Sequence, residues 1–410
     1  MDMCMGMAKL LLLLLLVVTA GHGHAAAAAG KERNTITHVK GFDGPLPFAL
    51  ETGYVEVDEA HGAELFYYFI QSERSPREDP LILWITGGPG CSALSGLLFE
   101  IGPLKFDVAG YTEGFPRLVY FEDSWTRVSN VIFLDAPVGT GFSYAREEEG
   151  LDVSLTGTGT HLRVFLQRWI ADHPEFASNP LYIGGDSYSG DFVTTPRNAQ
   201  CANALMAITM ATFAVNPVHI LEPMCGLALR PPTPVSSILS TGTRRRSARL
   251  LVQEADRLAL PVECRDNGYR LSYAWADDAE VRATLGIREG SVGAWSRCVT
   301  LTHFRHDVAS TVPYHTNLTR RGYRALVYNG DHDMDMTFVG TQAWIRTLGY
   351  PAVAPWRPWY ANRQVAGFTT EYAHNLTFAT VKGGGHTAPE YRPKECLAML
   401  DRWTSADGRL

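Results

Sequence analysis

The chain has 410 residues, of which 46% are hydrophobic, and 43 Asp and Glu against 36 Lys and Arg give a net charge of −7. A chain of this length can bury a large hydrophobic core, as one large domain with an insertion or as two smaller domains. The acidic balance argues against nucleic acid as the main partner.

The N-terminus has the pattern of a secretory signal peptide. Lys9 precedes an apolar run over residues 10–18 and small residues follow, so we expect cleavage between residues 20 and 29. The run is too short to span a bilayer with margin, and no later stretch reaches that length, so we expect no membrane partner for the mature chain. Extracellular and vacuolar destinations both stay open, because both routes begin with such a signal.

The apolar run Pro80–Ile85 predicts a buried strand, and a glycine-rich turn, Thr86–Ser92, follows it. Consecutive glycines let backbone N–H groups approach a substrate oxygen closely. Two amides aimed at a tetrahedral oxyanion stabilise its charge, and we predict the N–H groups of Gly88 and Tyr188 for this oxyanion hole. The alternative is a glycine turn without a catalytic role.

The apolar spacing over His161–Ile170 predicts a helix, and the run Pro180–Gly184 predicts the next strand. The sequence Gly-Asp-Ser-Tyr-Ser-Gly follows at residues 185–190. A serine between small residues at a sharp turn after a strand is typical of a nucleophile elbow, so Ser187 is the predicted nucleophile. Such a short motif is weak by itself, and its weight comes from an acid and a base further along the chain.

The acid and the base follow in the expected order. The strand-like run Arg324–Tyr328 precedes Asp333, and a second run, Phe378–Val381, precedes His386. Serine is a poor nucleophile until a histidine takes its proton, and a buried carboxylate orients that imidazole. The order nucleophile, acid, histidine is that of the α/β-hydrolases. Taken singly, Asp333 and His386 would be a solvated turn acid and a surface histidine.

These motifs, together with Gly41–Phe48, Glu64–Phe69 and Asn130–Tyr144, resemble the serine carboxypeptidase-like family in its plant branch. The likeness runs in order through nearly the whole mature chain. It implies an α/β-hydrolase fold with a mixed, mostly parallel sheet and an inserted helical cap. It also implies that the serine, aspartate and histidine above form the catalytic triad.

The resemblance further implies a substrate-binding set made of Thr86, Gly87, Glu100 and Asp186. In carboxypeptidases of the family, two carboxyls that share a proton, with an asparagine before the double glycine, hold the C-terminal carboxylate of the substrate. Like charges in contact raise one pKa of such a pair. Here Thr86 stands at the asparagine position, and Asp186 is one methylene shorter than the usual glutamate.

Asp-Ser-Tyr-Ser at the elbow and His386–Tyr391 after the glycines resemble the acyltransferase-like branch of the family. Its members pass an acyl group from a sugar ester, through the serine, to an alcohol or amine. We therefore expect acyl transfer between small molecules, with no cofactor and no metal. Two alternatives stay open: a carboxypeptidase acting on peptides at acidic pH, and a shortened, catalytically impaired paralogue or splice variant. The sequence gives no oligomeric state.

Six cysteines follow the signal segment, and an oxidising route makes disulfides plausible. The resemblance implies the pairs Cys91–Cys298 and Cys225–Cys264. No Cys-x-x-Cys or histidine-rich spacing supports the alternative of metal ligation. Asn317 and Asn375 each begin an Asn-x-Thr sequon, a predicted glycosylation site in a secreted chain.

The stretch after the elbow departs from the expected fold. Pro196 blocks a helix nine residues past Ser187, and no strand pattern occurs before Cys201. The family has several dozen more residues here, so we infer that one central strand is missing. The expected division is a signal peptide at 1–29, a first core part at 30–200, a cap or insertion at 201–322 with a mobile, arginine-rich loop at 231–249, and a second core part at 323–410.

Overall fold

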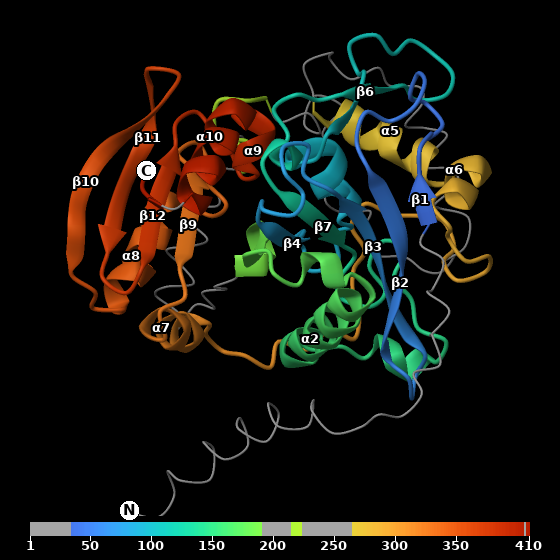
Figure 1. Cartoon of the computed structure of the whole chain (residues 1–410), viewed down its shortest axis with the longest axis horizontal. Helices are drawn as coiled ribbons and strands as arrows, with labels where there is room; N and C mark the ends of the chain where they lie inside the picture. Colours follow the sequence, from blue (N-terminus) through green and yellow to red (C-terminus); the bar gives the residue numbers. More distant parts are fainter. Residues whose placement is uncertain (1–33, 191–214, 224–264, 406) are drawn as a thin grey trace, which may run out of the picture. The chain divides into compact units, whose positions relative to one another are not determined.

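The computed structural model describes residues 34–190, 215–223, 265–405 and 407–410 (Figure 1). All of these belong to the compact unit that spans residues 33–410. The predicted signal peptide, the loop at 231–249 and the pair Cys225–Cys264 lie outside the described residues, as do Pro196 and Cys201.

The larger sheet has six strands, in the spatial order β1-β2-β3-β7-β4-β8. The three strands at one end pair in parallel, β7 with β4 and β4 with β8, while β1, β2, β3 and β7 pair antiparallel in that order. A short turn connects β2 to β3, and such a turn permits only an antiparallel pair. The strands are β1 (Asn34–Ile36), β2 (Leu50–Asp58), β3 (Ala63–Ile70), β4 (Leu81–Ile85), β7 (Asn130–Leu134) and β8 (Leu181–Gly185).

A second sheet of four strands has the order β10-β11-β12-β9, and only its pair β12 and β9 is parallel. The mixed α/β architecture agrees with the sequence prediction, but the described sheets are not mostly parallel, because parallel pairing is confined to β7, β4 and β8 in the larger sheet and to β12 and β9 in the smaller. The strands of this sheet are β9 (Ala325–Gly330), β10 (Ala352–Ala361), β11 (Gln364–Tyr372) and β12 (Leu376–Val381). A separate two-stranded ribbon consists of β5 (Leu104–Phe106) and β6 (Leu118–Tyr120).

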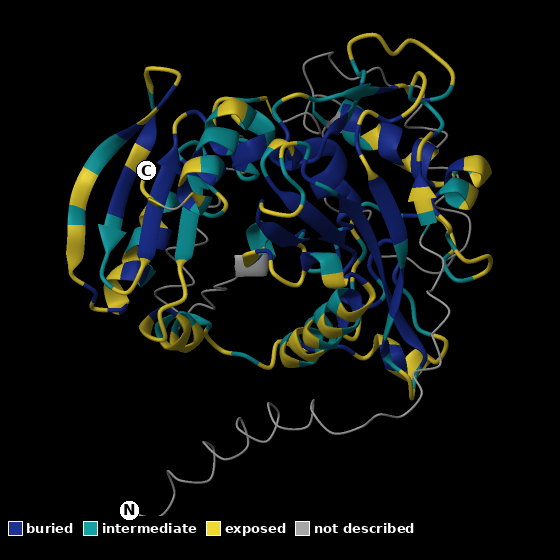
Figure 2. Cartoon of the chain, in the orientation of Figure 1, coloured by how far each residue is buried: buried dark blue, intermediate teal, exposed yellow. Residues whose placement is uncertain are grey.

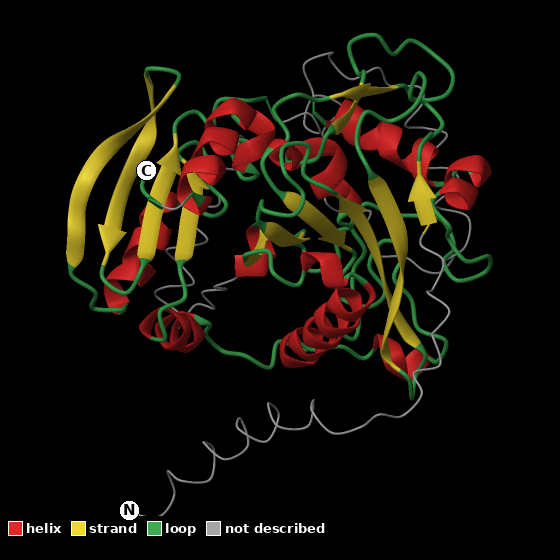
Figure 3. Ribbon diagram, viewed as in Figure 1, coloured by secondary structure: helices red, strands yellow, loops and turns green. Residues whose placement is uncertain are grey.

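Helices cover the sheets, with α2 beside the larger sheet and α8 beside the smaller (Figure 3). The Ser154 hydroxyl accepts a hydrogen bond from Gly157 N at the start of α2, and Thr337 does the same for Gly340 N at the start of α8. The helices are α2 (Leu155–Asp172), α5 (Asp266–Ala276), α6 (Ala279–Thr284), α7 (Val312–Arg320), α8 (Phe338–Thr347), α9 (Ala388–Tyr391) and α10 (Pro393–Thr404), with short helical turns at Gly96–Glu100, Trp125–Arg127, Glu148–Leu151, Pro174–Phe176 and Ser187–Gly190.

The hydrophobic core is continuous on one face of the two sheets and divided on the other. On the first face, side chains such as Trp84 of the larger sheet and Val381 of the smaller belong to one buried cluster, which also contains Met399 of α10. On the second face, Leu83 packs in a cluster with α2, and Phe378 packs in a separate cluster with α8. Successive side chains of a strand point to opposite faces, so each strand contributes to both layers.

The division of the core coincides with two open strand edges. β8 pairs only with β4 and β9 only with β12, and no described strand pairs with their other edges. Leu181 and Ile183 of β8 are 43% and 64% exposed. Figure 2 shows β9 as half-buried beside the buried β12. An unpaired edge with exposed apolar side chains is what the loss of a central strand predicts.

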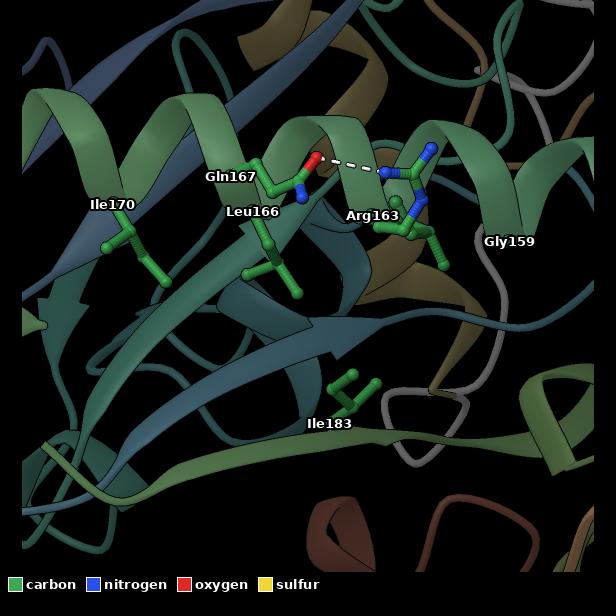
Figure 4. Close-up of a pocket in the computed structure, with 7 residues that line it drawn as sticks. Gly159, Arg163, Leu166, Gln167, Ile170 and Ile183 are labelled. Atoms are coloured by element: carbon green, nitrogen blue, oxygen red, sulfur yellow. Dashed lines mark hydrogen bonds between the residues drawn. The ribbon is translucent and has the colours of Figure 1, made fainter. Parts of the chain in front are cut away.

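A pocket of about 650 Å³ lies between α2 and the exposed Ile183 of β8. Leu166 and Ile170 point from α2 toward Ile183, and Leu162 also lines the pocket (Figure 4). Among the described helices, none is both long enough and apolar enough to cross a membrane.

Candidate active site

Ser187 lies at the tight turn between β8 and the short helical turn that follows. Its φ of 50° is in the left-handed region, which a residue with a side chain seldom adopts. Strain of this kind costs about 1–3 kcal/mol and persists where the surrounding structure enforces it. The strained turn agrees with the predicted elbow.

Two neighbouring parallel strands position Asp333 and His386. β9 and β12 pair in register up to Gly330 and Val381, so the loops after them leave the same edge of the sheet. Gly330 allows the close approach of these loops, because a Cβ there would lie 2.3 Å from the carbonyl oxygen of Gly384. His332 N also donates to Gly384 O, at 2.9 Å.

A continuous chain of hydrogen bonds joins the three predicted residues. His386 Nε2 lies 2.8 Å from Ser187 Oγ, and His386 Nδ1 lies 3.0 Å from Asp333 Oδ2. Asp333 is buried, and its other oxygen accepts hydrogen bonds from the backbone N–H groups of Asp335 and Met336. The Asp333 carboxyl is thus placed to accept from Nδ1–H, which leaves Nε2 free to accept the serine proton.

Electrostatics at His386 favour its charged form. Burial lowers the pKa of the imidazole, but the hydrogen bond to Asp333 and the charges of Asp333, Asp335 and Asp186 outweigh burial, and the pKa is raised. A histidine with a raised pKa is a stronger proton acceptor when it is neutral.

Residues 215–223 form hydrogen bonds with both the acid turn and the histidine loop of the site. Val218 O accepts from His386 N at 2.7 Å, and Pro217 O accepts from the N–H groups of Met334 and Asp335. His219 is buried, and its Nε2 lies 3.3 Å from His332 Nδ1. These contacts hold the acid turn and the histidine loop together.

The glycine turn after β4 reaches the elbow. A Cβ at Gly87 would lie 2.7 Å from both Ser187 Cβ and Tyr188 N, so only glycine fits there. Gly88 has a φ of 118°, a backbone conformation that favours glycine. The predicted disulfide Cys91–Cys298 is present and ties this turn to the chain before α7. The turn thus lies against Ser187, as the predicted oxyanion hole requires.

Two carboxyls of the predicted binding set have raised pKa values. Burial raises the pKa of Asp186 to about 6, and it raises the pKa of Glu100 well above its ordinary value, to which the charge of Asp186 adds. Asp186 Oδ1 accepts from Gly87 N at 3.2 Å. Among the described residues, the buried atoms Glu100 Oε2 and Thr86 Oγ1 have no hydrogen-bond partner. Unpaired buried polar atoms are costly, so these atoms are available to a ligand.

One residue near the site has no place in the sequence prediction. Asp335 Oδ2 lies 3.8 Å from His386 Nε2, and the Asp335 side chain is 59% exposed. In the sequence, Asp335 is marked only as one of three alternating aspartates, at 331, 333 and 335, of which the predicted triad includes Asp333.

The predicted modification sites lie on the surface. Asn317 is exposed on α7, and Asn375 is exposed in the turn between β11 and β12, where its Nδ2 donates to Gly322 O. Their glycosylation stays a prediction. Within the described residues, no group of three or more His, Cys, Asp or Glu side chains could hold a metal ion, and Cys396 is a buried free thiol.

The mixed sheet with a serine elbow after a parallel strand defines the chain as a protein of the α/β-hydrolase fold. The chain belongs to the serine carboxypeptidase family, whose model matches residues 41–199 and 194–406.

Plant relatives align with most of the chain. Serine carboxypeptidase-like 4 of Arabidopsis thaliana is 42% identical over 407 residues, and serine carboxypeptidase-like 2 is 41% identical over 405. Each alignment covers 90% of this chain and 91% of the relative. The solved structure of Kex1, a prohormone-processing carboxypeptidase from Saccharomyces cerevisiae, has a TM-score of 0.62 at 17% identity, covering 88% of this chain and 93% of Kex1. That likeness concerns the fold alone.

Proposed function

We propose that this protein is a secreted acyl-enzyme catalyst that transfers an acyl group from a sugar ester to an acceptor alcohol or amine. The observation that carries the proposal is the hydrogen-bonded chain from Ser187 through His386 to Asp333. In this scheme Ser187 is the nucleophile, His386 the general base and Asp333 the group that orients the imidazole.

The reaction has two halves. Ser187 Oγ attacks the ester carbonyl carbon while His386 Nε2 takes its proton, and the imidazolium then protonates the departing sugar oxygen. The N–H groups of Gly88 and Tyr188 stabilise the oxyanion in both halves. The acceptor next attacks the acyl carbon, gives its proton to Nε2, and that proton returns to Ser187 Oγ as the acyl–serine bond breaks.

Thr86 supports acyl transfer over peptide cleavage. It occupies the position where carboxypeptidases of the family have an asparagine, and a threonine hydroxyl reaches less far than an asparagine amide. The raised pKa values of Asp186 and Glu100 favour the second candidate, a carboxypeptidase that works at acidic pH. A protonated carboxyl can donate a hydrogen bond to the C-terminal carboxylate of a peptide.

A fluorophosphonate probe tests the acyl-enzyme. The purified wild type should be labelled at one site, Ser187→Ala should lose labelling, and Ser189→Ala, two residues along the same turn, should keep it. A folded wild-type protein that resists the probe would favour the third candidate, a catalytically impaired variant. Transcript reads with additional sequence between the codons for Gly190 and Thr195 would identify the chain as a shortened form.

The choice between the two activities requires substrates. The enzyme is offered an acyl-glucose with a small alcohol and, separately, a peptide with a free C-terminus at pH 4–7. Transfer product without peptide cleavage is expected, whereas release of C-terminal residues without transfer would establish the carboxypeptidase. Secretion is tested by the N-terminus of the protein recovered outside the producing cell, which should lie between residues 21 and 30.

A further inference from the structure

Asp335 lies beside the imidazole nitrogen of His386 that must take the proton of the second substrate. Its Oδ2 is 3.8 Å from Nε2, the imidazole nitrogen that also lies 2.8 Å from Ser187 Oγ. An acceptor hydroxyl has to give its proton to this nitrogen, so it must come within about 3 Å of it. A charged group one or two bonds from the attacking oxygen then lies within about a Debye length, 8–10 Å, of the Asp335 carboxylate.

The position of Asp335 is fixed by its backbone. Its N–H donates to Asp333 Oδ1 at 2.9 Å and to Pro217 O at 3.1 Å, and neither contact involves its own carboxylate. The side chain is 59% exposed, so its negative charge is hydrated and faces the solvent side of the site. Replacement of the carboxylate by an amide therefore leaves these anchoring bonds intact.

The electrostatic field at the His386 imidazole is negative. The charges that act most strongly on the His386 imidazole belong to Asp333, Asp335 and Asp186, and all are carboxylates. Asp333 is buried and Asp186 is half-buried, so Asp335 is the most exposed of the three. A negative site attracts cations and repels anions over roughly a Debye length of 8–10 Å.

We propose that Asp335 determines acceptor specificity by selecting alcohols that carry a positive charge close to the attacking hydroxyl. The inference rests on the proposed acyl transfer and adds the chemical class of the acceptor. The same carboxylate disfavours an anionic acceptor alcohol.

The experiment measures how an acyl-enzyme divides between acceptors. A p-nitrophenyl ester acylates the serine without any sugar, and three two-carbon alcohols compete with water: 2-(dimethylamino)ethanol, ethylene glycol and glycolate. At pH 6.5 these are cationic, neutral and anionic. For the wild type and Asp335→Asn, transfer product is measured for each, and the cation-to-neutral and anion-to-neutral ratios are compared between variants, which cancels the intrinsic reactivity of each alcohol.

In Asp335→Asn we expect the cation-to-neutral ratio to fall about two- to five-fold and the anion-to-neutral ratio to rise by a similar factor. This is the effect that a partly exposed ion pair has on an equilibrium or rate. Asp335→Glu should restore the wild-type ratios. The matched control is Asp43→Asn, which also removes one exposed carboxylate. Asp43 pairs with Arg117 and is far in sequence from the site residues, so the variant should leave the ratios unchanged.

Unchanged ratios in Asp335→Asn overturn the inference and leave acyl transfer standing. If all three alcohols give only hydrolysis and no transfer product, both the role of Asp335 and the proposed acyl transfer are wrong. If acyl-glucose fails as donor while the charge preference holds, the proposed donor is wrong and the role of Asp335 stands. Should Asp335→Asn not fold, wild-type ratios in 1 M NaCl decide: loss of the cation preference supports the inference, and persistence overturns it.

Discussion

β4 and β8 are neighbours in one sheet, and each leads to a loop of the site, yet their surroundings differ. Leu83 of β4 is fully buried, whereas Ile183, its register partner on β8, is 64% exposed. β4 has strands on both edges and helices on both faces, while the second edge of β8 meets no described strand. The site geometry at Ser187 therefore coexists with a strand that is supported on one side only.

Removal of these two side chains should show the difference most clearly. Leu83→Ala leaves a cavity in a packed core and should lower the free energy of unfolding by about 2–5 kcal/mol. Ile183→Ala removes a mostly exposed side chain and should change it by less than about 0.5 kcal/mol. Urea unfolding followed by circular dichroism measures both. Equal losses would mean that Ile183 is covered in solution.

Glycine substitutions test the same contrast at the site. Gly87→Ala places a Cβ against the backbone of the elbow and should slow fluorophosphonate labelling of Ser187 about 100-fold. Gly184→Ala on β8 meets only the Trp84 ring, at 3.4 Å, and should stay within about two-fold of the wild type. Labelling time courses give both rates. A Gly87→Ala protein that labels normally would show that the glycine turn does not reach the elbow.

Two carboxyls that follow neighbouring strands should both make the stability of the protein depend on pH. Burial raises the pKa of Asp135, after β7, and of Asp186, after β8, to about 6. Between about pH 4 and 6 the folded protein keeps protons that the unfolded chain has released, so the free energy of unfolding falls as pH rises, by at most about 3 kcal/mol for each group.

Amide variants separate the two groups. Asp186 accepts one backbone hydrogen bond, so Asp186→Asn should flatten the pH dependence and raise stability at pH 7. Asp135 accepts from Ser92 Oγ, Ala93 N and Phe142 N, which one amide oxygen cannot replace. Asp135→Asn should therefore be less stable at both pH values. Urea unfolding at pH 4 and pH 7 compares the three proteins, and parallel profiles for wild type and Asp186→Asn would refute the assignment.

The smallest effect concerns the pocket between α2 and β8. Its apolar lining should bind the dye anilinonaphthalene sulfonate, and Ile183→Asp should reduce the dye fluorescence with little change in stability. Val353→Asp, at a 69% exposed position of β10, is the control and should keep the signal. If both variants lose equal fluorescence, the dye binds elsewhere.

The strands that carry the site were predictable from the sequence because each is a short apolar run that ends in glycine or acidic turn residues. β4, β8, β9 and β12 each begin within two residues of the predicted run. The pairing of Asp333 with His386 was predictable from order, since both follow strands. Cys91–Cys298 came from family resemblance, because spacing alone does not give connectivity.

Other features depend on contacts between distant parts of the chain. The nearness of Asp335 to His386 depends on how Val215–Pro223 anchors the acid turn, and no local pattern encodes that contact. Glu100 lies at the end of a π-helical turn, Gly96–Glu100, and no local pattern encodes its electrostatic interaction with Asp186. The division of the core into separate clusters on one face likewise follows from strand pairing rather than from local propensity.

The Cys91–Cys298 bond joins parts of the chain that lie before and after residues 224–264. That interval contains Arg244, Arg245 and Arg246, a sequence that trypsin-like proteases cleave. A protein cut there would consist of two polypeptides that migrate together on a gel until a reducing agent separates them. The bond thus makes the covalent integrity of the molecule independent of an unbroken backbone at that position.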